Sequence, residues 1–368
     1  MQWITTAEDA HQLADWSRAP AVAMDTEFMR EKTYFPELAL VQLGRPGEVL
    51  LLDAPALGAH PALIGLLRSP TLKVMHSASE DLQALLHACG ELPRPLFDTQ
   101  IAAGLAGMDP GLSYQKLVEQ LCGTLLEKGE TRSDWLRRPL SQAQLNYAAD
   151  DVRYLLDPWQ QLEERLRTLG RMEWLQEDCE RLLESADAAE DPQPHLAMRP
   201  AQGLPREAQA RLRRLLLWRA ERARSGNRPR NWVLDAGLAL DLAQRDGLTR
   251  AEFETLLDRN PKSPRKRRDE LFDALQLPLT AQELDIPLAQ LPDPSEREGL
   301  KRLQAAVAAR AAVLQLSEST LASRKHLETL LREGRWSRVL QGWRRGLLAE
   351  TLLPLLPGPQ REAAAAQP

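Results

Sequence analysis

NYAADDVRYLL, residues 146–156, is the stretch of this chain around which the rest can be interpreted. Apolar residues recur in it at helical spacing, which predicts a helix with one buried face. Tyr147 and Asp151 lie four residues apart and therefore project from the same side of that helix. Such a pair more often belongs to the solvent-facing side of an ordinary amphipathic helix. Whether it has a function therefore depends on acidic residues elsewhere in the chain.

A short apolar strand upstream ends in two carboxylates. AVAMDTEF, residues 21–28, predicts a buried strand, and Asp25 and Glu27 lie two residues apart on one of its faces. Neighbouring carboxylates on a buried strand repel each other and resist desolvation, so stability alone seldom selects them. A bound divalent cation would compensate both charges.

Asp81 is a third acidic candidate, in the first turn of a predicted helix. The helix dipole also favours an aspartate there, so a purely structural role is the alternative. Together with Asp25, Glu27 and Asp151 it would form a site for two hard cations, Mg²⁺ or Mn²⁺, which prefer oxygen ligands. Two such ions support the attack of water on a phosphodiester. Tyr147, with an ordinary phenol pKa of about 10, is a poor base at neutral pH, so we expect it to orient the water.

Length and composition indicate several domains. A chain of 368 residues exceeds the usual size of one hydrophobic core, and 43% hydrophobic with 27% charged residues is typical of globular proteins. Cys89, Cys122 and Cys179 show no CxxC spacing, which argues against a disulfide framework or a zinc site. The N-terminus lacks the pattern of a signal peptide, and no segment is apolar enough to span a bilayer. We therefore expect a cytoplasmic protein with no membrane partner.

The net charge of −5 is unevenly divided along the chain. Residues 199–268 hold 18 Lys and Arg against 8 Asp and Glu, a local charge of +10, so the remainder carries −15. An acidic metal centre joined to a basic module that binds a polyanion would explain this division, and uneven surface charge is the alternative. If the basic run KSPRKRR, residues 262–268, contacts RNA, it binds phosphates and weakens with salt. Otherwise it is a solvated loop.

The order of the expected elements predicts the fold class. Residues 1–100 alternate between strands and helices, with a hairpin within residues 38–53, which indicates an α/β domain with a mixed sheet. Four prolines in residues 189–205 predict a linker. The helical segments that follow, residues 206–285 and 286–368, share a spacing of apolar residues. That similarity indicates either a repeat or two unrelated amphipathic helices.

Three segments resemble the ribonuclease D family of the DEDD 3′→5′ exonuclease superfamily, in the subclass with tyrosine in its third motif. They are DTEFMREKTYFPELALVQL (25–43), HSASEDL (76–82) and TRSDWLRRPLSQAQLNYAADDVRYLL (131–156). The resemblance implies a ribonuclease H-like α/β catalytic domain over residues 1–188, with a mixed sheet flanked by helices. It also implies hydrolysis of RNA 3′ ends with release of nucleoside 5′-monophosphates.

The resemblance also implies a role for each site residue. The catalytic residues on the family pattern are Asp25, Glu27, Asp81, Tyr147 and Asp151, all of which are present. Asp25, Glu27 and Asp151 would bind one divalent cation, Mg²⁺ or Mn²⁺. Asp25 would bridge to a second cation, where Asp81 acts largely through water.

The downstream segments are similar to the helicase-and-ribonuclease-D C-terminal (HRDC) domain, which implies two all-α domains. LLLWRAERARSGNRPRNWVLDAGLALDLAQ (215–244) fits a first domain over 206–285. LASRKHLETLL (321–331) and LQGWRRGLLAE (340–350) fit a second over 286–368, which favours the repeat. The family further implies a monomer that trims transfer RNA precursors with 3′ extensions.

Several residues near the expected site have a structural and a functional interpretation. Asp150 points about 100° away from Asp151 around the helix, so we exclude it as a ligand, and we expect Asp98 to cap the following helix. The loop with Trp135 and Arg137 either approaches substrate or packs on the surface. Candidate RNA contacts, with core packing or solvation as the alternative, are Phe28, Met29, Gln42, His76, Lys262, Arg265, Lys266, Arg267 and Arg268.

Two other functions fit the same sequence. The site would also serve a DNA 3′→5′ exonuclease, because discrimination of the 2′-hydroxyl depends on pocket shape. A non-catalytic RNA-binding scaffold is the second alternative. The full set of five site residues argues against a scaffold, since loss of a ligand would be expected in an inactive relative.

Overall fold

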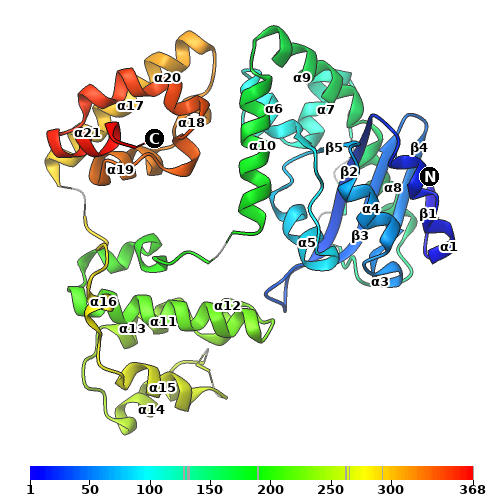
Figure 1. Ribbon diagram of the computed structural model, residues 1–368. Coiled ribbons are helices and arrows are strands. Elements are labelled where there is room, and N and C mark those ends of the chain that lie inside the picture. Colours follow the sequence, from blue (N-terminus) through cyan, green and yellow to red (C-terminus); the bar gives the residue numbers. More distant parts are fainter. Residues whose placement is uncertain are drawn as a thin grey trace. The chain divides into compact units, whose positions relative to one another are not determined.

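A six-stranded sheet with the strand order β1-β4-β3-β2-β5-β6 forms the centre of the N-terminal part of the chain (Figure 1). Strand β3 is antiparallel to β2 and β4, and the other pairs are parallel, which confirms the predicted hairpin and mixed sheet. The computed structural model describes residues 1–126, 129–130, 133–188, 190–261, 263–264, 266–291 and 293–367. The strands are β1 (Gln2–Ile4), β2 (Ala21–Met29), β3 (Glu37–Arg45), β4 (Glu48–Asp53), β5 (Leu72–Met75) and β6 (Leu96–Asp98).

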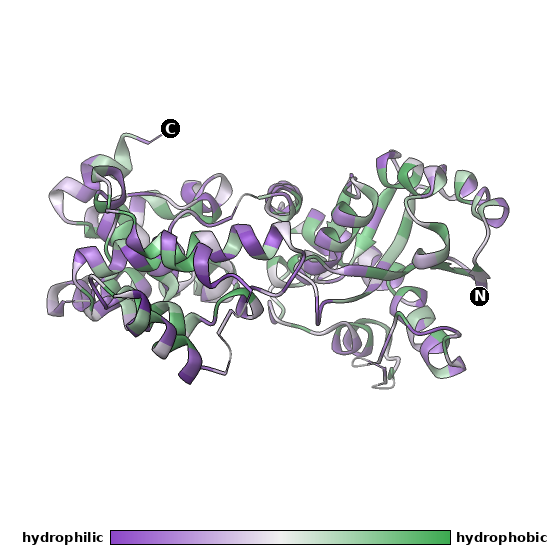
Figure 2. Ribbon diagram, turned by 90° about the horizontal axis from the view of Figure 1, so that it is seen from below, coloured by the Kyte–Doolittle hydropathy of each residue, from purple (hydrophilic) through white to green (hydrophobic). Residues whose placement is uncertain are grey.

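Helices cover both faces of this sheet. Successive strand residues point to opposite faces, so Ala23 packs in one hydrophobic cluster with α8 and Met24 in another with α4 and α5. Figure 2 shows the strands mostly in the hydrophobic colour, whereas the helices alternate between both colours. The helices of this part are α1 (Ala7–Ala10), α2 (Leu13–Trp16), α3 (Ala54–Leu57), α4 (Pro61–Arg68), α5 (Ser79–Cys89), α6 (Thr99–Leu105), α7 (Tyr114–Cys122), α8 (Gln142–Arg153), α9 (Leu156–Thr168) and α10 (Met172–Ala186).

Helix α8 carries most of the stretch at residues 146–156. Ser141 caps its N-terminus in a capping box with Gln144, which satisfies backbone N–H groups that the first turn leaves free. The helix ends at Arg153, and α9 begins at Leu156. The predicted stretch therefore spans the junction of two helices, and only its first part lies over the sheet.

The contacts divide the chain into two units. The first unit contains Met1–Met29, Glu37–Asp187 and Asp293–Pro368. The second unit contains Arg30–Pro36 and Ala188–Pro292. The last helices thus group with the sheet rather than with the other helical segment. The borders of the predicted domains remain predictions.

The last helices pack onto α10 through a buried ion pair. Arg344 donates to both carboxylate oxygens of Asp178, at 2.6 and 2.8 Å. Beside it, the rings of Trp174 and Trp343 stack with their centroids 4.4 Å apart. The elements of this segment are α17 (Pro294–Leu314), α18 (Glu318–Leu321), α19 (Arg324–Glu333), η3 (Arg338–Leu340), α20 (Trp343–Leu352), η4 (Leu353–Leu355) and α21 (Gly358–Ala365).

The second unit is helical and has its own core around Phe253 and Leu212. It includes the connection between β2 and β3, because the side-chain oxygen of Asn227 accepts hydrogen bonds from the backbone N–H groups of Tyr34 and Phe35, at 3.0 and 3.1 Å. The elements of this unit are η1 (Pro194–Ala197), η2 (Arg199–Gly203), α11 (Arg206–Ser225), α12 (Arg230–Val233), α13 (Ala236–Ala243), α14 (Arg250–Arg259), α15 (Arg268–Gln276) and α16 (Ala281–Leu284). Two short 3-10 helices, η1 and η2, therefore lie within the segment predicted as a linker.

The three cysteines are free thiols, as the sequence predicted. Cys89 and Cys179 are buried, and Cys122 is partly buried. In the described part of the chain, no helix is long and apolar enough to cross a membrane.

Candidate active site

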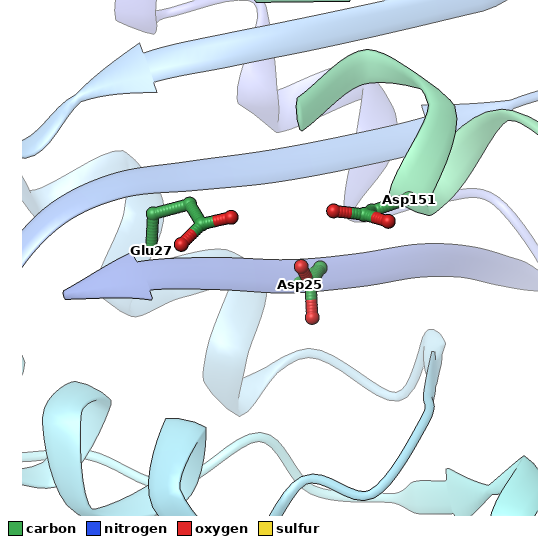
Figure 3. Close-up of side chains that lie close together, drawn as sticks. All are labelled: Asp25, Glu27 and Asp151. Carbon is green, nitrogen blue, oxygen red and sulfur yellow. The ribbon is translucent and has the colours of Figure 1, made fainter. Parts of the chain in front are cut away.

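Three carboxylates from two elements point toward one another on one face of the sheet (Figure 3). Asp25 and Glu27 stand on β2, and Asp151 projects toward them from α8. One oxygen atom from each residue lies within 4.8 Å of the other two. The structure thus brings together the three residues that the sequence analysis assigned to a first cation.

A glycine allows α8 to lie this close to the sheet. Gly44 on β3 pairs with Ala23 on β2, two residues before Asp25. A β-carbon on Gly44 would lie 2.6 Å from the backbone oxygen of Val152, the residue after Asp151. Any side chain there would push α8 away. The sequence analysis missed this role, because glycine at the end of a strand resembles the start of a turn.

Asp81 approaches the cluster from α5. Its side chain is 8% exposed and accepts a 2.5 Å hydrogen bond from the hydroxyl of Thr26, which lies between the two carboxylates of β2. Among the described residues, the group whose oxygen atoms could share one ion does not include Asp81. Asp81 is thus a fourth acidic group beside the other three. The expected contact of Asp81 with a second cation through water remains a prediction.

Burial and mutual repulsion shift the pKa values of these carboxylates. Burial, followed by the negative charges of the other three carboxylates, raises the pKa of Asp25 well above its usual range. Burial is also the largest cause for the others, raising the pKa of Glu27 to about 9, of Asp151 to about 7 and of Asp81 to about 6. A cluster that resists ionisation in this way is compensated by divalent cations, and its oxygen donors are those that Mg²⁺ and Mn²⁺ prefer.

Tyr147 lies one turn before Asp151 on the same helix. Burial, with the negative charges of Asp151 and Glu27, raises the pKa of Tyr147 above its ordinary value. The phenol therefore keeps its proton at neutral pH and can donate or accept a hydrogen bond. Trp135 is 2% exposed and packs beside Tyr147, with ring centroids 6.1 Å apart. It therefore supports the tyrosine ring and does not face solvent.

Arg138 holds the loop that contains Trp135. Its guanidinium donates to both carboxylate oxygens of Asp53 at the end of β4, at 3.0 and 2.7 Å, and to the backbone oxygen of Trp135 at 2.6 Å. A planar guanidinium is suited to such a two-pronged contact. The sequence analysis noted the neighbouring Arg137, which is exposed, and missed Arg138.

Three other polar residues have structural partners. The carboxylate of Asp98 accepts hydrogen bonds from the backbone of Gln100 and Ile101, which confirms that it caps α6. Asp150 pairs with Arg153 at 2.5 Å, in line with its exclusion as a ligand. In His76 both ring nitrogens are engaged, Nδ1 with the Thr99 hydroxyl at 2.9 Å and Nε2 with the backbone oxygen of Leu112 at 3.1 Å. His76 is therefore a packed histidine, as the structural interpretation had it.

The other candidate RNA contacts near the site differ in exposure. Phe28 and Met29 follow Glu27 on β2 and are partly exposed, beyond a register shift between Glu27 and Phe28. Gln42 is fully buried and donates from Nε2 to Asp25 at 3.5 Å. Phe28 and Met29 are therefore exposed enough to contact RNA directly, and this contact remains a prediction.

Carboxylates of the second unit neutralise part of the basic run. Arg267 pairs with Glu270 at 3.1 Å, and Arg268 pairs with Glu254 at 2.5 Å and with Asp258 at 2.7 Å. Lys266 is exposed. The remaining candidates of the run, Lys262 and Arg265, lie outside the described residues.

Known proteins similar to this chain identify its family. A family model described as 3′-5′ exonuclease matches residues 1–167. The ribonuclease D of Xanthomonas oryzae pv. oryzae is 48% identical, and the match covers 96% of this chain and 98% of that protein. This chain belongs to the ribonuclease D family. The ribonuclease D of Pseudomonas paraeruginosa is 36% identical, with 97% of both chains covered.

A solved ribonuclease D has the same fold. The crystal structure of Escherichia coli RNase D superposes with a TM-score of 0.85 at 30% identity, covering 96% of this chain and 98% of that one. The chain is therefore an α/β exonuclease with a mixed sheet flanked by helices, followed by a helix-rich region of the HRDC type. As a ribonuclease D it is a hydrolase, a 3′→5′ exoribonuclease, and it acts on RNA. Its exonuclease superfamily uses divalent metal ions, which the acidic cluster fits.

Proposed function

We propose that this ribonuclease D removes nucleotides from RNA 3′ ends with two divalent cations, Mg²⁺ or Mn²⁺, held by its four clustered carboxylates. Asp25, Glu27 and Asp151 would hold the first cation, because one oxygen of each lies within 4.8 Å of the others. Asp25 together with Asp81 would hold the second cation. The convergence of these carboxylates in a buried place is the observation that carries the proposal.

The residues of the chain prepare the attack on the last phosphodiester. Bound cations supply activation of water and stabilise the negative charge on the leaving oxygen. Tyr147 keeps its proton, since burial raises its pKa, and orients the attacking water by hydrogen bonding. The water oxygen forms a bond to phosphorus and gives up one proton, the bond from phosphorus to the 3′ oxygen breaks, and that oxygen takes up one proton in return. The product is a nucleoside 5′-monophosphate.

The substrates that we propose are transfer RNA precursors with 3′ extensions. The similar Escherichia coli RNase D is an exoribonuclease involved in structured RNA processing. Residues 199–268, with their local charge of +10, would hold the folded part of the RNA through its phosphates, while the 3′ end enters the acidic site. A monomer suffices for this division of labour. Three free cysteines fit the reducing cytoplasm as its location.

A cleavage assay with two matched variants tests the proposal. RNA labelled at its 5′ end is incubated with Mg²⁺ or Mn²⁺, and then with excess chelator. We expect wild type to shorten the RNA stepwise from its 3′ end only when metal is present. Asp151→Asn should abolish the ladder, and Asp150→Asn should keep it, because Asp150 turns to Arg153 instead of the cluster.

Each other outcome has a definite meaning. If wild type binds the RNA but leaves it intact with both metals, the metal-dependent mechanism is wrong. If a DNA oligomer of the same sequence is shortened at an equal rate, the enzyme does not recognise the 2′-hydroxyl group of RNA. A transfer RNA with a 3′ extension should be trimmed to the mature end faster than a single strand of equal length, and equal rates would contradict the proposed substrate.

A further inference from the structure

Gln42 is a buried polar residue beside the acidic cluster. It lies on β3 directly opposite Asp25 on β2, and its exposed fraction is 0%. Its Nε2 donates to Oδ2 of Asp25 at 3.5 Å. Its other polar atom, Oε1, is buried and has no hydrogen-bond partner in the described part of the chain.

An unpaired acceptor in this position is costly to stability. Buried polar atoms in proteins are nearly always hydrogen-bonded, and one that is not has lost its water without compensation. Leu40, two residues earlier on the same face of β3, is apolar and equally buried. Packing alone would therefore favour an apolar side chain of the same volume over glutamine.

We propose that Gln42 is a positioning residue for Asp25. Its amide N–H group holds Asp25 in the orientation in which this carboxylate would hold the cations, and the unpaired Oε1 is the cost of placing an amide there. This inference rests on the metal site proposed above. An amide suits the task because it donates without adding charge, whereas a lysine would compete with the cations and a further carboxylate would increase the repulsion.

Complete burial distinguishes this role from contact with RNA. A side chain that nucleotides touch needs an exposed atom, and Gln42 has none. Groups that orient a metal ligand typically change metal affinity or activity about 10- to 100-fold when they are removed. The loss should therefore appear in metal binding and in kcat, and the KM for RNA should stay the same.

The full chain offers a matched control, the buried glutamine Gln209. Its Oε1 accepts from the backbone N–H of Ala289 at 2.7 Å, and its Nε2 donates to the backbone oxygens of Leu204 and Ala289. Gln209 is 1% exposed and fully paired, so it is purely structural. Methionine has nearly the same volume as glutamine and no amide, which makes Gln42→Met and Gln209→Met an equivalent pair.

The experiment measures Mn²⁺ affinity by calorimetry, thermal unfolding without metal, and cleavage kinetics. We expect Gln42→Met to weaken Mn²⁺ binding and lower kcat about tenfold or more, with an unchanged KM and an unfolding temperature equal to or above that of wild type. Gln209→Met should show the reverse, a lower unfolding temperature with wild-type Mn²⁺ affinity. Gln42→Leu should repeat the result of Gln42→Met.

Other results would overturn the inference. A raised KM with wild-type Mn²⁺ affinity would make Gln42 an RNA contact, and a Gln42→Met variant that unfolds early would make it part of the sheet packing. Wild-type values for Mn²⁺ affinity and kcat would leave Gln42 without a role. If wild type itself binds no Mn²⁺, the proposed metal site falls together with this inference, whereas the preceding results leave the metal site intact.

Discussion

The backbone oxygen of Val152 lies 2.6 Å from the place that a β-carbon on Gly44 would take. This contact sets the distance between α8 and the sheet at the residue next to Asp151. Since Asp25 and Glu27 are on the sheet and Asp151 is on the helix, the same contact sets the width of the acidic cluster.

Gly44→Ala should damage the site more than the fold. The added methyl group clashes with backbone, so α8 must move outward, which costs about 1–3 kcal/mol in the free energy of unfolding. Asp151 moves with the helix, and Mn²⁺ affinity and the cleavage rate should fall. Urea unfolding and calorimetry measure the two effects.

A second glycine provides the control for that variant. Gly65 in α4 has no atom within 4 Å of an added β-carbon. Gly65→Ala should therefore leave metal binding unchanged and stabilise the helix by about 0.5–1 kcal/mol. Should both variants behave alike, the contact with Val152 does not position α8.

Metal binding and stability should respond to pH in opposite directions. The raised pKa values of Asp81, Asp151 and Glu27, about 6, 7 and 9, mean that cations must displace protons, so Mn²⁺ affinity should rise from pH 6 to pH 9. Without metal, the folded state binds more protons than the unfolded state above pH 4. Stability is then lost as pH rises through these values.

Thermal unfolding with and without metal checks this prediction. The unfolding temperature with chelator should fall between pH 5 and pH 9, and saturating Mg²⁺ should remove most of that fall. Asp151→Asn should flatten the curve without metal, because one buried carboxylate is gone. A metal-free protein that becomes more stable over this range would contradict the pKa shifts.

Tyr147→Phe should separate catalysis from metal binding. The three residues assigned to the first cation are all carboxylates, so Mn²⁺ affinity should equal that of wild type. The attacking water loses the hydrogen bond that orients it, and kcat should fall about 100-fold, as for a reactant that is held out of its attack geometry. Rapid-quench kinetics and calorimetry on the same preparation give both values. Weaker Mn²⁺ binding would instead make Tyr147 part of the ligand shell.

Asp178→Asn should detach the last helices from α10. It leaves the guanidinium of Arg344 without its buried partner, and breaking a pair of this kind costs about 3–5 kcal/mol. The exposed pair of Arg94 and Glu180 is the control, because Glu180→Gln should cost about 0–1 kcal/mol. Urea unfolding of both variants measures these losses in the free energy of unfolding. Equal small losses would show that the ion pair does not hold the last helices on α10.

Sequence reasoning found residues of the acidic cluster because their spacing is local. Asp25 and Glu27 share a face by strand periodicity, and Tyr147 and Asp151 share one by helix periodicity, so the spacing alone predicts each pair. Asp81 was a candidate from its place in the first turn of a predicted helix, and only the family motif distinguished it from an aspartate that the helix dipole favours. Strand alternation likewise sufficed to predict the hairpin of β3 and β4.

Other features depend on pairing between distant segments. The role of Gly44 follows only from the register of β3 against α8, and the burial of Trp135 only from the packing of its loop on Tyr147. The start of α5 is a further example, because Ser79 is its first residue and Ala78 occupies the cap position, although a serine there is typical of a cap. A serine before a helical pattern fits both positions equally well.

The division into two units changes what severing the chain would do. Ala188–Pro292, the larger part of the second unit, lies between Asp187 and Asp293 of the first, so this segment is joined to the first unit at both of its ends. A protease that cuts the chain at one end of this segment would not release the segment, because the chain at its other end is intact. The ion pair of Asp178 and Arg344 would also still hold the last helices to α10. RNA bound to this unit would therefore stay attached to the rest of the protein after a single cut.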